Sequence, residues 1–211
     1  MAARIAVVAY QGVLADESHA FRDVFRRVPD AEVVTVGEHI GVVAGPGGTQ
    51  VVAATFRDLP IVDVVVVPGG LGSHHHNEIG WWILAAEPTW VVTSSTGSAL
   101  LAAAGLLRGR TAATHWLAGP LLERHGVRVS RQRIVVDQPF VTCSGMATTT
   151  DAALTALARA WEDKYGAEWH FDAHDGAFHH GAGTAHVFRV VADRAYAFGK
   201  DPYSHTRFRF R

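Results

Sequence analysis

The stretch Val62-Asp-Val-Val-Val-Val67, followed at once by Pro68-Gly-Gly70, decides the fold class of this chain. Its branched apolar residues run on without the polar alternation of a strand that is half exposed to water. Continuous apolar runs of this length are typical of parallel strands that helices cover on both faces. The stretch therefore predicts a buried strand of an α/β sheet that ends in a glycine turn.

On both sides of this stretch, apolar runs of strand length alternate with longer amphipathic segments. The pattern predicts strands at residues 4–10, 31–36, 62–67, 90–93, 111–114 and 132–143, a hairpin around the turn at 45–48, and helices at 17–27, 79–86, 99–107 and 148–165. Alternation of this kind is the signature of an α/β fold with a parallel sheet. We expect a doubly wound, flavodoxin-like sandwich with a mostly parallel sheet.

The helical period ends at Tyr165, and the rest of the chain is rich in His, Gly, Asp and aromatic residues. We therefore expect an α/β domain over residues 1–165 and an extension over residues 166–211 that packs on it. If the aromatic rings of the extension stayed exposed, they would leave a large apolar area in water, and burying such area contributes about 25 cal/mol per Å². The extension should be ordered against the sandwich or a partner subunit. Its alternating end, Arg207-Phe-Arg-Phe-Arg211, favours an edge strand or a dimer contact over stacking on nucleic acid.

Composition excludes several classes of function. The 211 residues carry 19 Lys and Arg against 20 Asp and Glu, so no basic field exists to hold a nucleic acid. The single cysteine, Cys143, allows no intrachain disulfide, and the N-terminus shows no secretory signal. The longest apolar stretches fall far short of the roughly 20 residues that cross a bilayer. We expect a cytoplasmic protein without membrane or nucleic-acid partners.

Four segments that follow predicted strands carry a family resemblance. They are Gln11-Gly12 leading to Asp16-Glu17, Pro68 to Gly72, Thr93 to Gly97, and Thr114 to Trp116. In this order the segments resemble the ThiJ/PfpI superfamily, and the branch most similar to this chain contains isonitrile hydratase and sensor domains of transcription regulators. Thr142-Cys-Ser-Gly145 and Asp151 also fit the pattern, which covers roughly residues 4 to 160.

The resemblance implies a nucleophile on a strained strand-to-helix turn, where helix amide groups stabilise an anion. Ser95 stands at that position, where most members carry a cysteine of low pKa. Glu17 matches the partner carboxylate and His115 the downstream histidine. The departure at Ser95 argues against thiolate chemistry, because a hydroxyl forms no anion near neutral pH without a contacting base. Thr96 resembles a substrate-binding threonine of isonitrile hydratase.

Each candidate also has a structural interpretation. Glu17 is either a general acid or base with a raised pKa, or a solvated carboxylate in the first turn of a helix. Ser95 either contacts substrate or caps the next helix. His115 either lines the pocket or closes a strand. Cys143 is expected to be a buried, inert thiol, and the alternative is a relocated nucleophile.

Further residues at the same sheet edge are candidates for substrate contact: Gly70, Gly72, His74, His75, His76, Thr96 and Trp116. Three adjacent histidines cannot point all their rings one way, so we expect no metal site. No cofactor fingerprint appears in the sequence, and we expect none to be required.

Three functions fit these observations. The first is an enzyme of the hydratase, lyase or isomerase type that uses acid-base chemistry on a small molecule. The second is a module that binds a metabolite without turnover. The third is a thiol-dependent activity of the glyoxalase or deglycase type, which the missing cysteine disfavours. In each case we expect a small-molecule ligand and a homodimer.

Overall fold

A seven-stranded sheet forms the centre of the computed structural model, which describes residues 3–181, 183–185, 194–200 and 203–209. In spatial order the strands are β10 (Ile134–Asp137), β11 (Phe140–Cys143), β7 (Trp90–Ser94), β6 (Val64–Val67), β1 (Arg4–Val8), β2 (Glu32–Gly37) and β5 (Ala54–Thr55). Every pairing is parallel except that of β10 with β11. The predicted α/β, flavodoxin-like fold with a mostly parallel sheet is confirmed.

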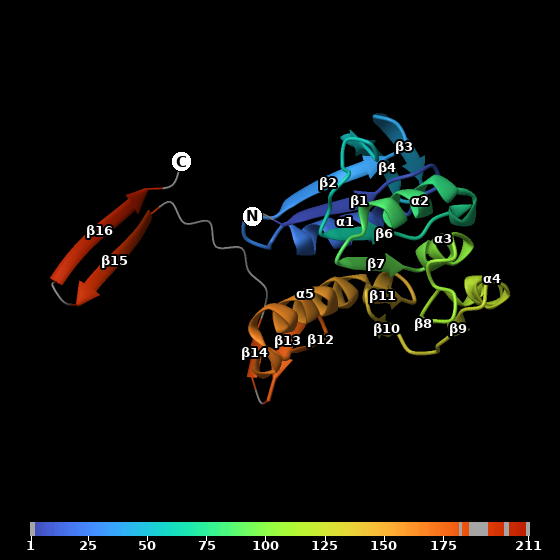
Figure 1. Ribbon diagram of the computed structural model, residues 1–211. Helices are drawn as coiled ribbons and strands as arrows, with labels where there is room; N and C mark the ends of the chain where they lie inside the picture. The colour runs from blue at the N-terminus through green and yellow to red at the C-terminus, as the bar shows by residue number, and fades with distance from the viewer. Residues whose placement is uncertain (1–2, 182, 186–193, 201–202, 210–211) are drawn as a thin grey trace.

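Helices cover both faces of this sheet (Figure 1). One face carries α1 (Ala15–Phe25) and α5 (Thr149–Tyr165), which contact each other and bury Phe21, Phe25 and Leu154. The other face carries α2 (Asn77–Ala86), α3 (Gly97–Ala103) and α4 (Gly119–Arg124). The valines of β6 are buried between the two layers, as the continuous apolar run predicts. Among the described residues, no helix is long and apolar enough to cross a membrane.

Two elements differ from the prediction. The helix expected over residues 99–107 is α3, which ends at Ala103, because Gly105 adopts a left-handed φ of +78° that stops the helical path. The single strand expected over residues 132–143 is two antiparallel strands, since the chain reverses between Asp137 and Phe140. Both differences lie where the chain changes direction, and the spacing of apolar residues does not predict the positions of such turns.

Smaller sheets surround the sandwich. A hairpin of β3 (Gly41–Gly45) and β4 (Gly48–Val52) surrounds the predicted glycine turn, and β8 (Thr111–Ala112) pairs with β9 (Arg128–Val129). Four short 3-10 helices complete the described sandwich: Ser73–His75, Trp116–Ala118, Met146–Thr148 and Ala167–Trp169.

After the short 3-10 helix at Ala167–Trp169, the described part of the extension beyond residue 165 consists of strands. A three-stranded sheet of β12 (Asp172–His174), β13 (Ala177–His180) and β14 (Gly183–Ala185) contacts α5, burying Ala177 and packing Phe178 on the core. A separate hairpin joins β15 (Arg194–Lys200) to β16 (Tyr203–Arg209). The side chains of this hairpin lie outside the described set, so the prediction that its rings are covered stays a prediction.

Candidate functional site

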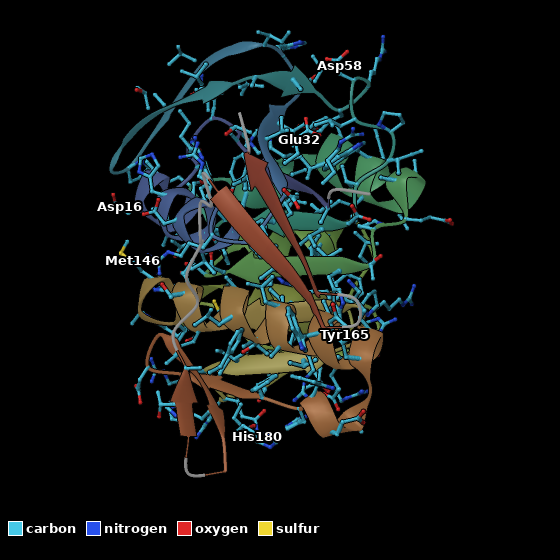
Figure 2. The ribbon with its side chains drawn as sticks, turned by 90° about the vertical axis from the view of Figure 1, so that its left-hand side faces the viewer. Asp16, Glu32, Asp58, Met146, Tyr165 and His180 are labelled. Carbon is cyan, nitrogen blue, oxygen red and sulfur yellow. The ribbon has the colours of Figure 1, made fainter. Side chains whose placement is uncertain are left out.

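The carboxyl ends of β1, β6 and β7 bring three sequence-distant segments together. Gly69, after β6, lies between Glu17 and Ser95: a Cβ built on Gly69 would stand 2.7 Å from Ser95 Cβ and 3.0 Å from Glu17 Oε2. Figure 2 shows the neighbouring Asp16 at the start of α1. The absence of a side chain at position 69 therefore allows the predicted carboxylate and the predicted turn residue to approach each other.

Glu17 is buried, with 1% of its surface exposed. Its Oε2 accepts hydrogen bonds from Gly69 N at 2.9 Å and from Ser94 Oγ at 2.5 Å. Burial raises the pKa of Glu17, and the two hydrogen bonds and nearby His115 only partly oppose this. The carboxyl group keeps its proton to a higher pH than an exposed glutamate does. This pKa favours the general acid or base interpretation over a solvated carboxylate.

Ser95 occupies the strained turn that the family resemblance implies. Its φ is +51°, an unusual value for a residue with a side chain, and it is 5% exposed. The Ser95 N–H donates to Cys143 O at 3.0 Å, so this amide is not free to stabilise an anion. Among the described residues no hydrogen bond joins Ser95 Oγ to a base. In the described residues, the hydroxyl is therefore not activated as a nucleophile.

Thr96 fastens two loops together. Its hydroxyl accepts from Gly70 N and donates to Gly70 O, both at 2.9 Å, and its carbonyl accepts from Ser73 Oγ. Gly70 also packs closely, since an added Cβ would lie 2.7 Å from Tyr10 Oη. These two hydrogen bonds hold the loop of Gly70 against the turn of Thr96. The hydroxyl of Thr96 therefore already has hydrogen-bond partners without a substrate.

His115 is half-buried beside the turn. Its backbone N–H donates to Ser95 O at 3.2 Å, and its Nδ1 accepts from Leu117 N at 3.4 Å. Its ring lies 5.7 Å from that of Trp116, which is 77% exposed. His115 acts electrostatically to lower the pKa of Glu17, and no hydrogen bond joins the two side chains among the described residues.

The described residues of the loop from Gly72 to His76 differ in their surroundings. Gly72 has a φ of +69° and begins the 3-10 turn, His75 is exposed, and the side chain of His74 lies outside the described set. His76 turns away toward Tyr10, with ring centroids 4.8 Å apart, and bonds to Glu78. Of the two histidines whose side chains the structure describes here, His76 lines a cavity and His75 does not, and Glu17 is not among the described lining residues.

Sequence reasoning missed Ser94 and Tyr10. Ser94 is buried at the end of β7, and the Tyr10 hydroxyl donates to Pro68 O at 2.8 Å. Burial and the neighbouring Glu17 raise the pKa of Tyr10, so this phenol stays neutral. The sequence did contain a signal for Ser94, because Thr93-Ser94-Ser95 places three adjacent hydroxyl groups at a strand end. It did not indicate which of these hydroxyl groups contacts Glu17.

Cys143 pairs in register with Ser94 and is fully buried. Burial raises the pKa of its thiol to about 11. A thiol in this environment is protonated near neutral pH and out of reach of solutes, which favours the prediction of an inert residue.

These features define a class: a flavodoxin-like α/β protein with a strained strand-to-helix turn beside a buried carboxyl group. The chain belongs to the DJ-1/PfpI family, whose family model matches residues 3–159. This membership confirms the resemblance to the ThiJ/PfpI superfamily.

Similar proteins agree with this assignment. The isonitrile hydratase of Pseudomonas putida is 36% identical over 139 residues, which make up 63% of this chain and 61% of that relative. A ThiJ/PfpI family protein from Pseudomonas syringae has a TM-score of 0.71 at 24% identity and matches 75% of this chain and 69% of its own. An AraC family transcriptional regulator from Pseudomonas putida has a TM-score of 0.64 at 14% identity, over 79% and 95% of the two chains. The two structures show the shared fold alone.

Proposed function

We propose that this chain is a hydratase-type enzyme that adds water to a small electrophilic molecule, with an isonitrile as the substrate class. The buried Glu17 carries the proposal, because its raised pKa gives it a proton to donate and a carboxylate to take one back. The similarity to an isonitrile hydratase supports the substrate class. The reaction needs neither a thiolate nor a redox partner.

The proposed step balances as an addition of water. Glu17 donates its proton to the terminal carbon of R–N≡C, and the oxygen of a water molecule bonds to the same carbon. A proton of that water returns to Glu17, which leaves R–N=CH–OH, and this tautomerises to the formamide R–NH–CHO. The Ser95 hydroxyl, next to Glu17 across Gly69, orients the water or the substrate.

The test is formamide production from benzyl isocyanide, measured by chromatography, for the full chain and two variants. Glu17→Gln keeps an oxygen to accept from Gly69 and Ser94 but removes the transferable proton, so the rate should fall by about 10²–10⁴-fold. Asp16→Asn is the matched control, because Asp16 is the adjacent, exposed carboxylate, and its rate should match that of the unsubstituted chain. Full activity of Glu17→Gln, or no formamide from a panel of alkyl and aryl isonitriles, would overturn the proposal.

A second candidate is a metabolite-binding module. The unactivated hydroxyl of Ser95 favours it, because a binding site needs no base in contact with that hydroxyl. A compound that raises the melting temperature, is recovered unchanged, and loses its effect in Ser95→Trp would support this function over catalysis.

We also propose that the chain forms a homodimer through the edge that carries the site. Four large apolar side chains are exposed on segments that follow its strands: Leu71, Trp116, Leu117 and Met146. Exposed apolar surface of this kind marks interaction sites. Light scattering should give twice the mass of one chain, and Leu117→Glu should shift the mass toward one chain. A monomer at all concentrations tested would contradict this.

A further inference from the structure

A cavity is lined by Tyr10 but not by Glu17. It has a volume of about 290 Å³ and is lined by residues that follow β1 and β2, by the β3–β4 hairpin and by the start of α2. Glu17, Gly69, Ser94 and Ser95 are not among its lining residues. The cavity is therefore separate from the site of the proposed chemistry, and a ligand can bind in it whether or not that chemistry takes place.

The lining carries two carboxylates and two histidines. Glu38 and Glu78 are the carboxylates, and neither Lys nor Arg is among the lining residues that the structure describes. Each carboxylate lies near a histidine of the lining, His39 at 3.8 Å and His76 at 3.1 Å. The side chain of Glu78 is 32% exposed, so its charge is partly shielded from water and acts more strongly on a ligand than a fully exposed charge would.

Most of the remaining lining residues are apolar, and several of them are held in place. Phe56 stacks on Trp82 with ring centroids 4.9 Å apart, and the Trp82 Nε1–H donates to Leu59 O. Tyr10 is held by its hydrogen bond to Pro68, and Ile79 is 1% exposed. Side chains fixed in this way form a cavity that exists before a ligand binds, which lowers the entropic cost of binding. Aromatic faces next to carboxylates also favour a cation.

We propose that this cavity binds a small organic amine in its ammonium form, with an apolar body against Phe56 and Tyr10 and its charge toward Glu78 and Glu38. A volume near 300 Å³ is at the lower end for ligand pockets, so it suits a ligand with a single ring. An ammonium group would give Glu78 a charged partner in addition to His76, which a neutral ligand of the same shape cannot do, and an anion would be repelled by the carboxylates.

The test is calorimetric titration of the full chain with 2-phenylethylamine, and with 2-phenylethanol as its neutral counterpart. The amine should bind with a Kd below about 1 mM and at least tenfold more tightly than the alcohol. Glu78→Gln should weaken amine binding by about tenfold, because it removes a partly buried charge. Glu38→Gln should weaken it by about two- to threefold, since that side chain is 60% exposed.

Two controls separate this cavity from the Glu17 site. Glu123→Gln removes a carboxylate on α4, outside the cavity lining, and should leave amine binding unchanged. Glu17→Gln should also leave it unchanged, although it abolishes the proposed turnover. Equal binding of the alcohol, no binding of the amine, or full amine affinity in the Glu38→Gln, Glu78→Gln double variant would each overturn the proposal.

Discussion

Glu17 and Glu78 show how two environments can suit one residue type to different proposed roles. Glu17 is 1% exposed and hydrogen-bonded to a backbone amide and a serine, and burial raises its pKa. Glu78 is one-third exposed in an open cavity and bonds to His76. The first group is suited to exchange a proton with a reactant, and the second to present a fixed charge to a ligand. These environments suit the two roles that we propose, proton exchange for Glu17 and ligand recognition for Glu78.

Gly69→Ala should disrupt the Glu17 region most strongly while leaving the Glu78 region intact. The added Cβ would lie 2.7 Å from Ser95 Cβ and 3.0 Å from Thr96 N, so the turn must move. We expect at least a 100-fold loss of turnover and a loss of about 1–3 kcal/mol in the free energy of unfolding. Amine binding should persist. The control is Gly119→Ala, whose added Cβ meets only Val129 at 3.9 Å, and equal behaviour of the two variants would contradict this explanation.

Ser94→Ala alters the environment of Glu17 without crowding it. The Ser94 hydroxyl bonds to the Glu17 carboxyl group and lowers its pKa, so its loss should raise that pKa further. Because a carboxyl group of higher pKa is a weaker acid, we expect maximal turnover to fall by up to about tenfold while the pH-rate profile moves toward alkaline pH, whereas amine binding beside Glu78 should not change. Ser130→Ala, which lies after β9, is the control. A slower enzyme with an unmoved pH profile would mean that Ser94 acts through packing alone.

The free energy of unfolding should depend on pH in the way that the raised pKa of Glu17 requires. A carboxyl group whose folded-state pKa lies above its unfolded-state value binds more protons in the folded state. Its contribution is therefore fully present at low pH and is lost as pH rises from the ordinary value of 4.5 through the raised one. Chemical denaturation across this range should show that loss, and Glu17→Gln should remove it. If the free energy of unfolding varies with pH equally in the unsubstituted chain and in Glu17→Gln, groups other than Glu17 cause that variation.

The sequence predicted the fold and part of the site for different reasons. Val64 to Val67 is a continuous apolar run, and such runs are typical of parallel strands that are covered on both faces, so the layers followed from the pattern. Ser95 and Glu17 follow predicted strands, whose ends meet at one edge in this fold. Ser94 and His76 could not be placed in this way, because the direction of a side chain at a strand end depends on the turn.

The cavity was also beyond sequence reasoning. Its lining joins the segment after β2 to the start of α2, and no periodic pattern links segments so far apart along the chain. In the sequence, Glu38 and Glu78 resemble ordinary surface carboxylates, and only tertiary contacts place them around one space. Such a site depends on packing between loops, which periodicity leaves undetermined.

Substitution of Cys143 should change turnover least of all. A raised pKa keeps a carboxyl group supplied with a proton to donate, but it keeps a thiol from forming the thiolate that reacts. In Glu17 the raised pKa retains a proton that the reaction can use. In Cys143 burial raises the pKa to about 11, which withholds the thiolate that thiol chemistry requires. Iodoacetamide should therefore not label the native chain near neutral pH, and Cys143→Ala should keep full turnover with about 1 kcal/mol less stability. Loss of activity on alkylation of Cys143, with the fold retained, would show that the thiol takes part after all.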